Sequence, residues 1–156
     1  MNNLAFLSGK RFGFVAASLF SIVFLSGCVE PQTISNYDQE TDISVTSLQK
    51  ITEAHLLSLD TVSGDAQKCK YENENYKKFY EEMKIDVSSI SLRADAIPND
   101  NTRTKKQIDL LRNSLGDLEK LHKLSCLSPE QIKIARSNLE SSFKAVLKLE
   151  LAKKRG

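Results

Sequence analysis

The stretch CKYENENYKKFYEEMKIDVSSISLRADAIP, residues 69–98, carries the clearest pattern in the chain. Its apolar residues recur at alternating spacings of four and three, namely Tyr76, Tyr80, Met83, Val87, Ile90, Ala94 and Ile97. This spacing places them on one face of an α-helix and predicts a helix over about residues 65–96 that buries that face. Pro98 and the polar Asn99-Asp100-Asn101 predict the end of this helix and a turn.

Three further segments show the same periodicity, over residues 38–59, over residues 102–124 and from Ser128 onward. Ser128-Pro129-Glu130-Gln131 is the best-marked helix start, because serine can cap the helix, proline suits its first position and glutamine can close a capping box. We therefore predict an all-α fold, an antiparallel bundle of about four helices over residues 38–156. The expected buried stripes are Val45, Leu48, Ile51, His55 and Leu59; Ile108, Leu111, Leu115, Leu118 and His122; and Ile132, Ala135, Leu139, Phe143, Val146 and Leu147.

Two cysteines lie inside the predicted bundle, Cys69 and Cys126. Cys69 lies seven residues before Tyr76 and so continues the stripe of its helix. An antiparallel hairpin closed by the turn at Pro98 brings the two cysteines level at its open end, and we predict a disulfide between them. Two free buried thiols are the alternative. In the chain-entropy model, closing a loop of this length stabilises the fold by about 4 kcal/mol.

The N-terminal segment has the order of an export signal. Lys10 and Arg11 precede a run without charge from Phe12 to Leu25. An uncleaved membrane anchor is the alternative, but this run of about 14 residues is shorter than the roughly 20 residues that a transmembrane helix needs. An even number of cysteines beyond residue 28 also suits an exported, oxidising environment.

Leu25-Ser26-Gly27-Cys28 follows this run and resembles the lipobox of bacterial lipoproteins. The resemblance implies cleavage after residue 27, a diacylglyceryl group on the thiol of Cys28 and a further acyl chain on its amine. It predicts a signal peptide over residues 1–27, a lipidated tether over residues 28–37 and the helical domain over residues 38–156. The membrane is then a partner through the lipid on Cys28, because several acyl chains hold a protein far more firmly than one.

The charge of the mature chain excludes one class of partner. The formal net charge of the whole chain is +2, and the signal peptide carries two of its positive charges, Lys10 and Arg11, and no negative ones. Residues 28–156 are therefore neutral. Because nucleic-acid binding depends on clustered Lys and Arg that neutralise phosphates, we expect no nucleic-acid partner.

Residues with catalytic chemistry do not form a known motif. His55 and His122 lie on apolar stripes without a His-Glu-x-x-His pattern, so two core histidines are expected, and a metal or acid–base pair is the alternative. Serine motifs, a Gly-rich phosphate loop and a Cys-x-x-Cys-His haem attachment are absent from the sequence. The sequence thus predicts no enzyme, no catalytic or metal-binding residue and no cofactor.

Some apolar residues fall off the predicted stripes, among them Phe79, Leu110 and Leu124. We interpret these three as candidate contacts for a protein partner, because an exposed apolar patch can mark a partner site. For Phe79, packing that widens the buried face of its helix is the alternative. The alternative function is a small-ligand binding bundle with an interior pocket near the aromatic residues and the histidines.

Three stretches together resemble a group of small uncharacterised proteobacterial lipoproteins: Asn36-Tyr37-Asp38 with Thr41-Asp42, residues 92–98 and residues 147–156. The resemblance implies the envelope of a Gram-negative bacterium and no particular activity. Because Val29 is not the aspartate that retains such lipoproteins in the inner membrane, the periplasmic face of the outer membrane is expected. The predicted architecture is also similar to that of secretin pilotins, although their groove residues find no match here. We therefore expect a membrane-anchored, non-catalytic interaction or structural module whose partner is an envelope protein.

Overall fold

The computed structural model describes residues 36–97 and 102–155. The predicted signal peptide, the lipidation site Cys28, most of the tether and the turn at Pro98 lie outside the described residues. The described part forms four helices, α1 (Gln39–Val62), α2 (Glu74–Ala96), α3 (Thr102–Leu124) and α4 (Pro129–Lys153). The predicted all-α fold is confirmed.

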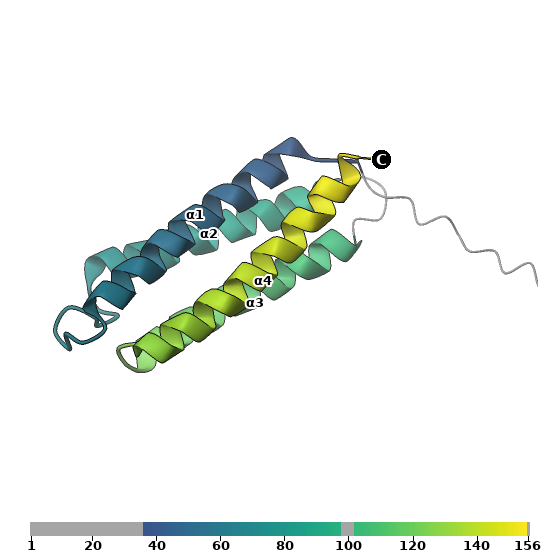
Figure 1. Cartoon of the computed structure of the whole chain (residues 1–156). Coiled ribbons are helices and arrows are strands. Elements are labelled where there is room, and N and C mark those ends of the chain that lie inside the picture. Colours follow the sequence, from purple (N-terminus) through teal and green to yellow (C-terminus); the bar gives the residue numbers. More distant parts are fainter. Residues whose placement is uncertain (1–35, 98–101, 156) are drawn as a thin grey trace, which may run out of the picture. The chain divides into compact units, whose positions relative to one another are not determined.

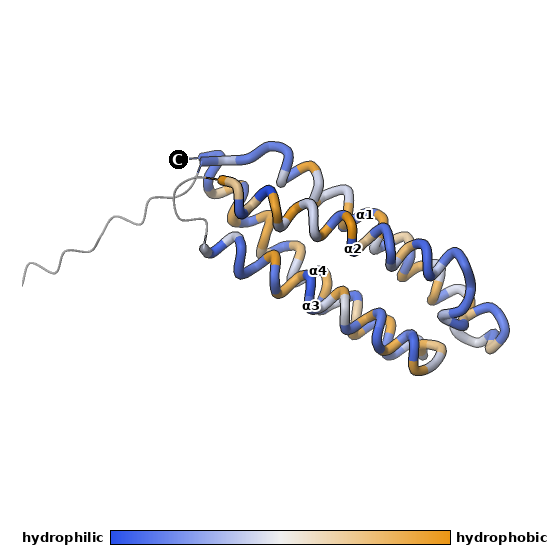
Figure 2. Tube along the Cα trace, turned by 180° about the vertical axis from the view of Figure 1, so that it is seen from behind, coloured by the Kyte–Doolittle hydropathy of each residue, from blue (hydrophilic) through white to orange (hydrophobic). Residues whose placement is uncertain are grey.

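The helices form an antiparallel bundle in which each helix packs against the next one along the chain and α1 packs against α4 (Figure 1). The side chains that meet inside are those of the apolar stripes. Figure 2 shows hydrophilic and hydrophobic residues alternating along every helix, as expected for helices with one buried face. The short connection between α3 and α4, over residues 125–128, suits antiparallel neighbours.

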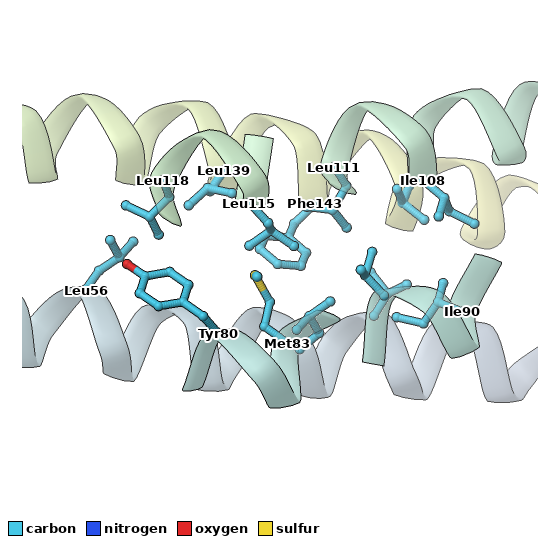
Figure 3. Packing of buried hydrophobic residues seen from close by; sticks show 14 of the residues in the cluster. Leu56, Tyr80, Met83, Ile90, Ile108, Leu111, Leu115, Leu118, Leu139 and Phe143 are labelled. Atoms are coloured by element: carbon cyan, nitrogen blue, oxygen red, sulfur yellow. The ribbon is translucent and has the colours of Figure 1, made fainter. Parts of the chain in front are cut away.

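The core runs along the axis of the bundle. In Figure 3, Leu56, Tyr80, Met83 and Ile90 of α1 and α2 point toward Leu111, Leu115, Leu118, Leu139 and Phe143 of α3 and α4. All of these side chains are buried. The predicted stripe of α2 is buried from Tyr76 to Ala94, and those of α3 and α4 are buried or packed against the core.

Local capping explains where α1 and α4 begin. The side chain of Asp38 accepts a hydrogen bond from the backbone N–H of Thr41, which satisfies a donor of the first turn of α1. Ser128 and Gln131 form the predicted capping box at the start of α4, with Pro129 at its first turn.

The predicted start of the second helix, near Asp65, is wrong, because α2 begins at Glu74. The carboxylate of Asp65 accepts hydrogen bonds from the backbone N–H groups of Gln67 and Lys68, which closes a turn rather than a helix. Asn73 then caps α2 through a hydrogen bond from the N–H of Asn75. Cys69 is buried in this connection and not on the helix.

The predicted stripe of α1 contains one error. Ile51 is 37% exposed, whereas Thr52 and Leu56 are each 1% exposed. The buried face therefore continues from Leu48 at a spacing of four, through Thr52 to Leu56. A polar residue thereby occupies a core position.

The predicted disulfide joins Cys69 and Cys126, whose Cα atoms lie 5.3 Å apart and which are separated by 57 residues. Both cysteines lie in connections, before α2 and after α3, at the end of the bundle where those helices begin and end. No helix within the described ranges combines the length and hydropathy that crossing a membrane requires.

Candidate functional site

A chain of hydrogen bonds connects four residues inside the bundle at the end that carries the disulfide. His55 Nε2 lies 3.2 Å from the hydroxyl oxygen of Tyr80, and that oxygen lies 3.0 Å from His122 Nδ1. His122 Nε2 in turn lies 2.7 Å from the carbonyl oxygen of Cys69. The two histidines that the sequence placed on separate stripes thus meet through one phenol.

The proton positions in this chain follow from its last acceptor. A carbonyl oxygen can only accept, so Nε2 of His122 carries a proton and, in the neutral ring, Nδ1 accepts. The hydroxyl of Tyr80 therefore donates to His122 and its oxygen accepts from His55, whose Nε2 carries a proton. One tautomer of each histidine satisfies the whole chain.

Aromatic rings enclose this chain of hydrogen bonds. The ring of Phe79 stacks on that of His55 with centroids 3.7 Å apart, and Tyr76 meets the same imidazole edge-on at 5.5 Å. Tyr71 stacks on Tyr80 at 5.6 Å. These contacts leave the imidazoles few polar neighbours, which favours their uncharged forms.

Burial holds both histidines neutral. Loss of hydration, together with the positive charge of a protonated His122, lowers the pKa of His55 to about 3. Burial also lowers the pKa of His122, while that of the Tyr80 hydroxyl is raised. A general acid or base works best with a pKa near the operating pH, so His55, whose pKa lies far below neutrality, suits a structural role better than proton transfer at neutral pH.

A buried carboxylate borders the aromatic cluster. Glu119 accepts hydrogen bonds from the Tyr71 hydroxyl at 3.0 Å and from Lys84 at 2.8 Å, and Lys123 lies 2.8 Å from the same oxygen. Burial alone would raise the pKa of Glu119, but these three donors outweigh it and lower the pKa to about 2. Residues 36–97 and 102–155 hold no cluster of three or more His, Cys, Asp or Glu side chains that could bind a metal.

The hollows that open on the described surface include two that border buried polar groups. One borders the aromatic cluster and the disulfide, and its walls include Lys70, Tyr71, His122, Leu124 and Cys126. The other is a pocket of about 290 Å³ between α1 and α4. We call it the α1–α4 pocket; its lining residues are Gln49, Thr52, Glu53, Leu56, Arg136, Leu139, Glu140 and Phe143.

The α1–α4 pocket contains buried polar atoms without hydrogen-bond partners. Thr52 is 1% exposed and its hydroxyl has no partner. Arg136 forms an ion pair with Glu53, in which Nε lies 3.0 Å from Oε1, but the angle at Nε does not fit a hydrogen bond. Nη2 of Arg136 has no hydrogen-bond partner either. Sequence reasoning missed both residues, although continuing the spacing of four from Leu48 would have placed Thr52 on the buried face.

The three predicted partner contacts do not lie together. Phe79 on α2 is half-buried and packs against the core and His55. Leu110 and Leu124 are 47% and 82% exposed on α3. Fourteen residues separate these two leucines, which is about 21 Å along a helix.

Comparison of the chain with protein-family models, with curated proteins and with solved structures finds no match.

Proposed function

We propose that this chain is a lipid-anchored lipoprotein of a Gram-negative envelope that acts as a non-catalytic binding module for an envelope protein. Its lipid is attached at Cys28, and its place is the periplasmic face of the outer membrane. The lipobox resemblance at residues 25–28 and the disulfide between Cys69 and Cys126 support this address.

The observation that supports a binding role is that the polar residues of the core form hydrogen bonds with one another and with the backbone. His55, Tyr80 and His122 satisfy one another and the Cys69 carbonyl, and burial keeps both imidazoles uncharged. The residues with the chemistry for proton transfer are therefore engaged in holding the bundle together. The surface features that remain are exposed apolar side chains, which favour a binding function.

The most exposed aliphatic side chains on α2 are Ile85 and Leu92, at 68% and 67%. They are seven residues apart and so share one face of the helix, which between Ile85 and Ala96 also presents exposed Ser88, Ser89 and Ala96 and no charged residue. This uncharged stripe and the leucines of α3 are the surfaces that we assign to the protein partner. Phe79 is a poor test position because its ring is part of the core.

Site-specific photocrosslinking in intact cells tests the role. A photoreactive residue at Leu92 or Leu124 is expected to capture one defined envelope protein, and one at Lys106 or Lys148 on exposed polar surface serves as the control. Leu92→Glu and Leu124→Glu are expected to abolish capture without changing the melting temperature. Capture that survives both substitutions, or equal capture at the control positions, contradicts the assignment of these surfaces.

A second candidate function is the binding of a small ligand. The observation that favours it is the α1–α4 pocket, because a concave site with an apolar floor and a few polar groups is the usual form of such sites.

A further inference from the structure

We propose that the α1–α4 pocket binds a small molecule with a short apolar body and a planar carboxylate or carboxamide head group. Thr52 and Arg136 hold the head group, and Leu56, Leu139 and Phe143 receive the apolar body. This site is separate from the surfaces of α2 and α3 that we assign to a protein partner.

The buried hydroxyl of Thr52 gives the first argument. A threonine on a helix can satisfy its hydroxyl on a backbone carbonyl of the preceding turn, as Thr61 does with Leu57. Thr52 Oγ1 makes no such bond, although its residue is 1% exposed and lines the pocket. Buried polar groups are nearly always paired, so a hydroxyl in this state is suited to a partner that enters the pocket.

The guanidinium of Arg136 gives the second argument. Arginine is a permanent donor, and its planar fork matches pairs of planar oxygens. Glu53 lies beside Nε, whereas Nη2 is buried in the wall of the same pocket without an acceptor. The two unpartnered groups, one on α1 and one on α4, therefore both offer hydrogen to an oxygen acceptor.

The charges of the pocket show which feature of the head group it recognises, its negative charge or its planar oxygen. Arg136 pairs with Glu53, and Glu140 pairs at 3.1 Å with Lys144, which lies outside the lining, so each charged group of the pocket wall has a partner of opposite sign. A balanced site does not select a full negative charge. Both a carboxylate and a neutral carboxamide can supply the oxygen, whereas an ammonium group cannot accept a hydrogen bond.

The size and floor of the pocket define the rest of the ligand. Leu56, Leu139 and Phe143 are each at most 2% exposed and form the apolar floor. A volume of about 290 Å³ lies just below the range for small-molecule sites, roughly 300 to 1,000 Å³, and so favours a small ligand. A chain of a few methylene groups fits this description.

Hexanoate and hexanamide are the probes, and hexylammonium is a control of the same length. In a titration followed by NMR of the backbone amides, both probes are expected to give saturable shifts at the lining residues of α1 and α4. Thr52→Val and Arg136→Met are each expected to weaken binding about tenfold, the effect of losing one good hydrogen bond at a buried site. Thr61→Val on α1 and Arg112→Met on α3 are matched controls and should bind as the wild type does.

Two further measurements keep a binding role apart from a structural one. Thr52→Val keeps the shape of the side chain, so its melting temperature should equal or exceed that of the wild type; a lower value would show that the hydroxyl already has a partner and would overturn the proposal. Arg136→Lys keeps the charge but loses the planar fork, and it should bind hexanoate as weakly as Arg136→Met. Binding of hexylammonium equal to that of hexanoate, or no saturable shift with either oxygen probe, also overturns it.

Discussion

The hydroxyl of Tyr80 donates a hydrogen bond to Nδ1 of His122 across 3.0 Å while its oxygen accepts one from His55. This arrangement needs the imidazole of His122 neutral, because a proton on its Nδ1 would face the phenol proton. Protonation of His122 therefore breaks a bond in the core, and protonation of His55 places a charge among aromatic rings. The bundle is built for the neutral state of both residues.

Acidification is accordingly expected to weaken the fold. The pKa of His55 falls from about 6.5 in the unfolded chain to about 3 in the folded one, so between these values the unfolded chain binds more protons. The free energy of unfolding should be constant above about pH 6.5 and drop by about 2 kcal/mol between pH 7 and pH 5 from His55 alone. Urea unfolding of the soluble domain at pH 7, 6 and 5 measures this.

His55→Gln is the matched variant, because its amide can donate to Tyr80 and does not titrate. Its stability should change less between pH 7 and pH 5 than that of the wild type. Asp38 and Glu119, whose pKa values are lowered to about 2, lose their contributions only below this range. Identical pH profiles for the two proteins would contradict the role given to His55.

The fold was predictable where one physical signal acts alone. Helical periodicity locates all four helices, and the capping residues Ser128 and Gln131 locate the start of α4 because their role is local. The start of α2 was not predictable in this way. Cys69 lies in phase with Tyr76, but the disulfide and the hydrogen bond from His122 to its carbonyl fix it in a connection, and both are contacts with distant residues.

The candidate sites were less accessible to sequence reasoning. The stripes put both histidines inside the bundle, yet no pattern shows that Tyr80 would stand between them. Thr52 escaped attention because the neighbouring Ile51 is the apolar residue, and a polar side chain in a core position carries no hydropathy signal. The position of Phe79 off the centre of its stripe left two alternatives open, a wider buried face or an accessible partner contact; its ring stacks on His55, so it widens the buried face of α2.

Removal of the charge of Glu119 is expected to destabilise the domain at neutral pH. Glu119→Gln weakens the hydrogen bonds from Tyr71 and Lys84 and the ion pair with Lys123, at an expected cost of about 2 kcal/mol in the free energy of unfolding. Glu82→Gln is the control, because Glu82 faces Lys78 at 3.7 Å on the exposed surface of α2 and should change stability by less than about 0.5 kcal/mol.

The pH dependence of the difference in stability between the wild type and Glu119→Gln gives a second check. Because the pKa of Glu119 is lowered, its contribution is present above about pH 4.5 and is lost as the pH falls toward 2. The wild type and Glu119→Gln should therefore approach one another in stability in acid. Equal destabilisation by the two glutamine substitutions at pH 7 would show that burial of Glu119 gives its interactions no advantage.

Asp38 combines two functions that substitution can separate. Its carboxylate caps α1 through the N–H of Thr41 and accepts hydrogen bonds from Arg93, whose proximity lowers the pKa of Asp38 to about 2. Asp38→Ala loses the cap and the ion pair and should cost about 1 to 2 kcal/mol. Asp38→Asn retains the cap and loses only the ion pair. Its cost should therefore be smaller than that of Asp38→Ala and similar to that of Arg93→Met, which also loses the ion pair. Thermal unfolding of the three variants decides this, and equal losses in the alanine and asparagine variants would contradict the capping role.

Reduction of the disulfide is expected to lower the melting temperature markedly, because the bond closes a loop of 57 residues. The chain-entropy model gives an upper value of about 4 kcal/mol for such a loop. The Cys69 carbonyl also accepts from His122, so reduction should change the near-ultraviolet circular dichroism of the tyrosines around that histidine. The double variant Cys69→Ala with Cys126→Ala should behave as the reduced protein does. Recovery of both cysteines as free thiols from the exported wild type would contradict the disulfide.

Attachment of lipid is predicted to depend on Cys28 alone among the three cysteines. Cys28→Ser lacks the thiol that would receive the diacylglyceryl group, so the chain should stay as a precursor that keeps residues 1–27 and incorporates no fatty acid in metabolic labelling. The double variant Cys69→Ser with Cys126→Ser is the control and should keep its label, because its lipobox is intact. Equal label in Cys28→Ser and in the wild type would contradict the lipoprotein proposal. In that case the binding module would need another means of staying near an envelope partner, and the α1–α4 pocket, whose proposed ligand is independent of the anchor, would become the better guide to function.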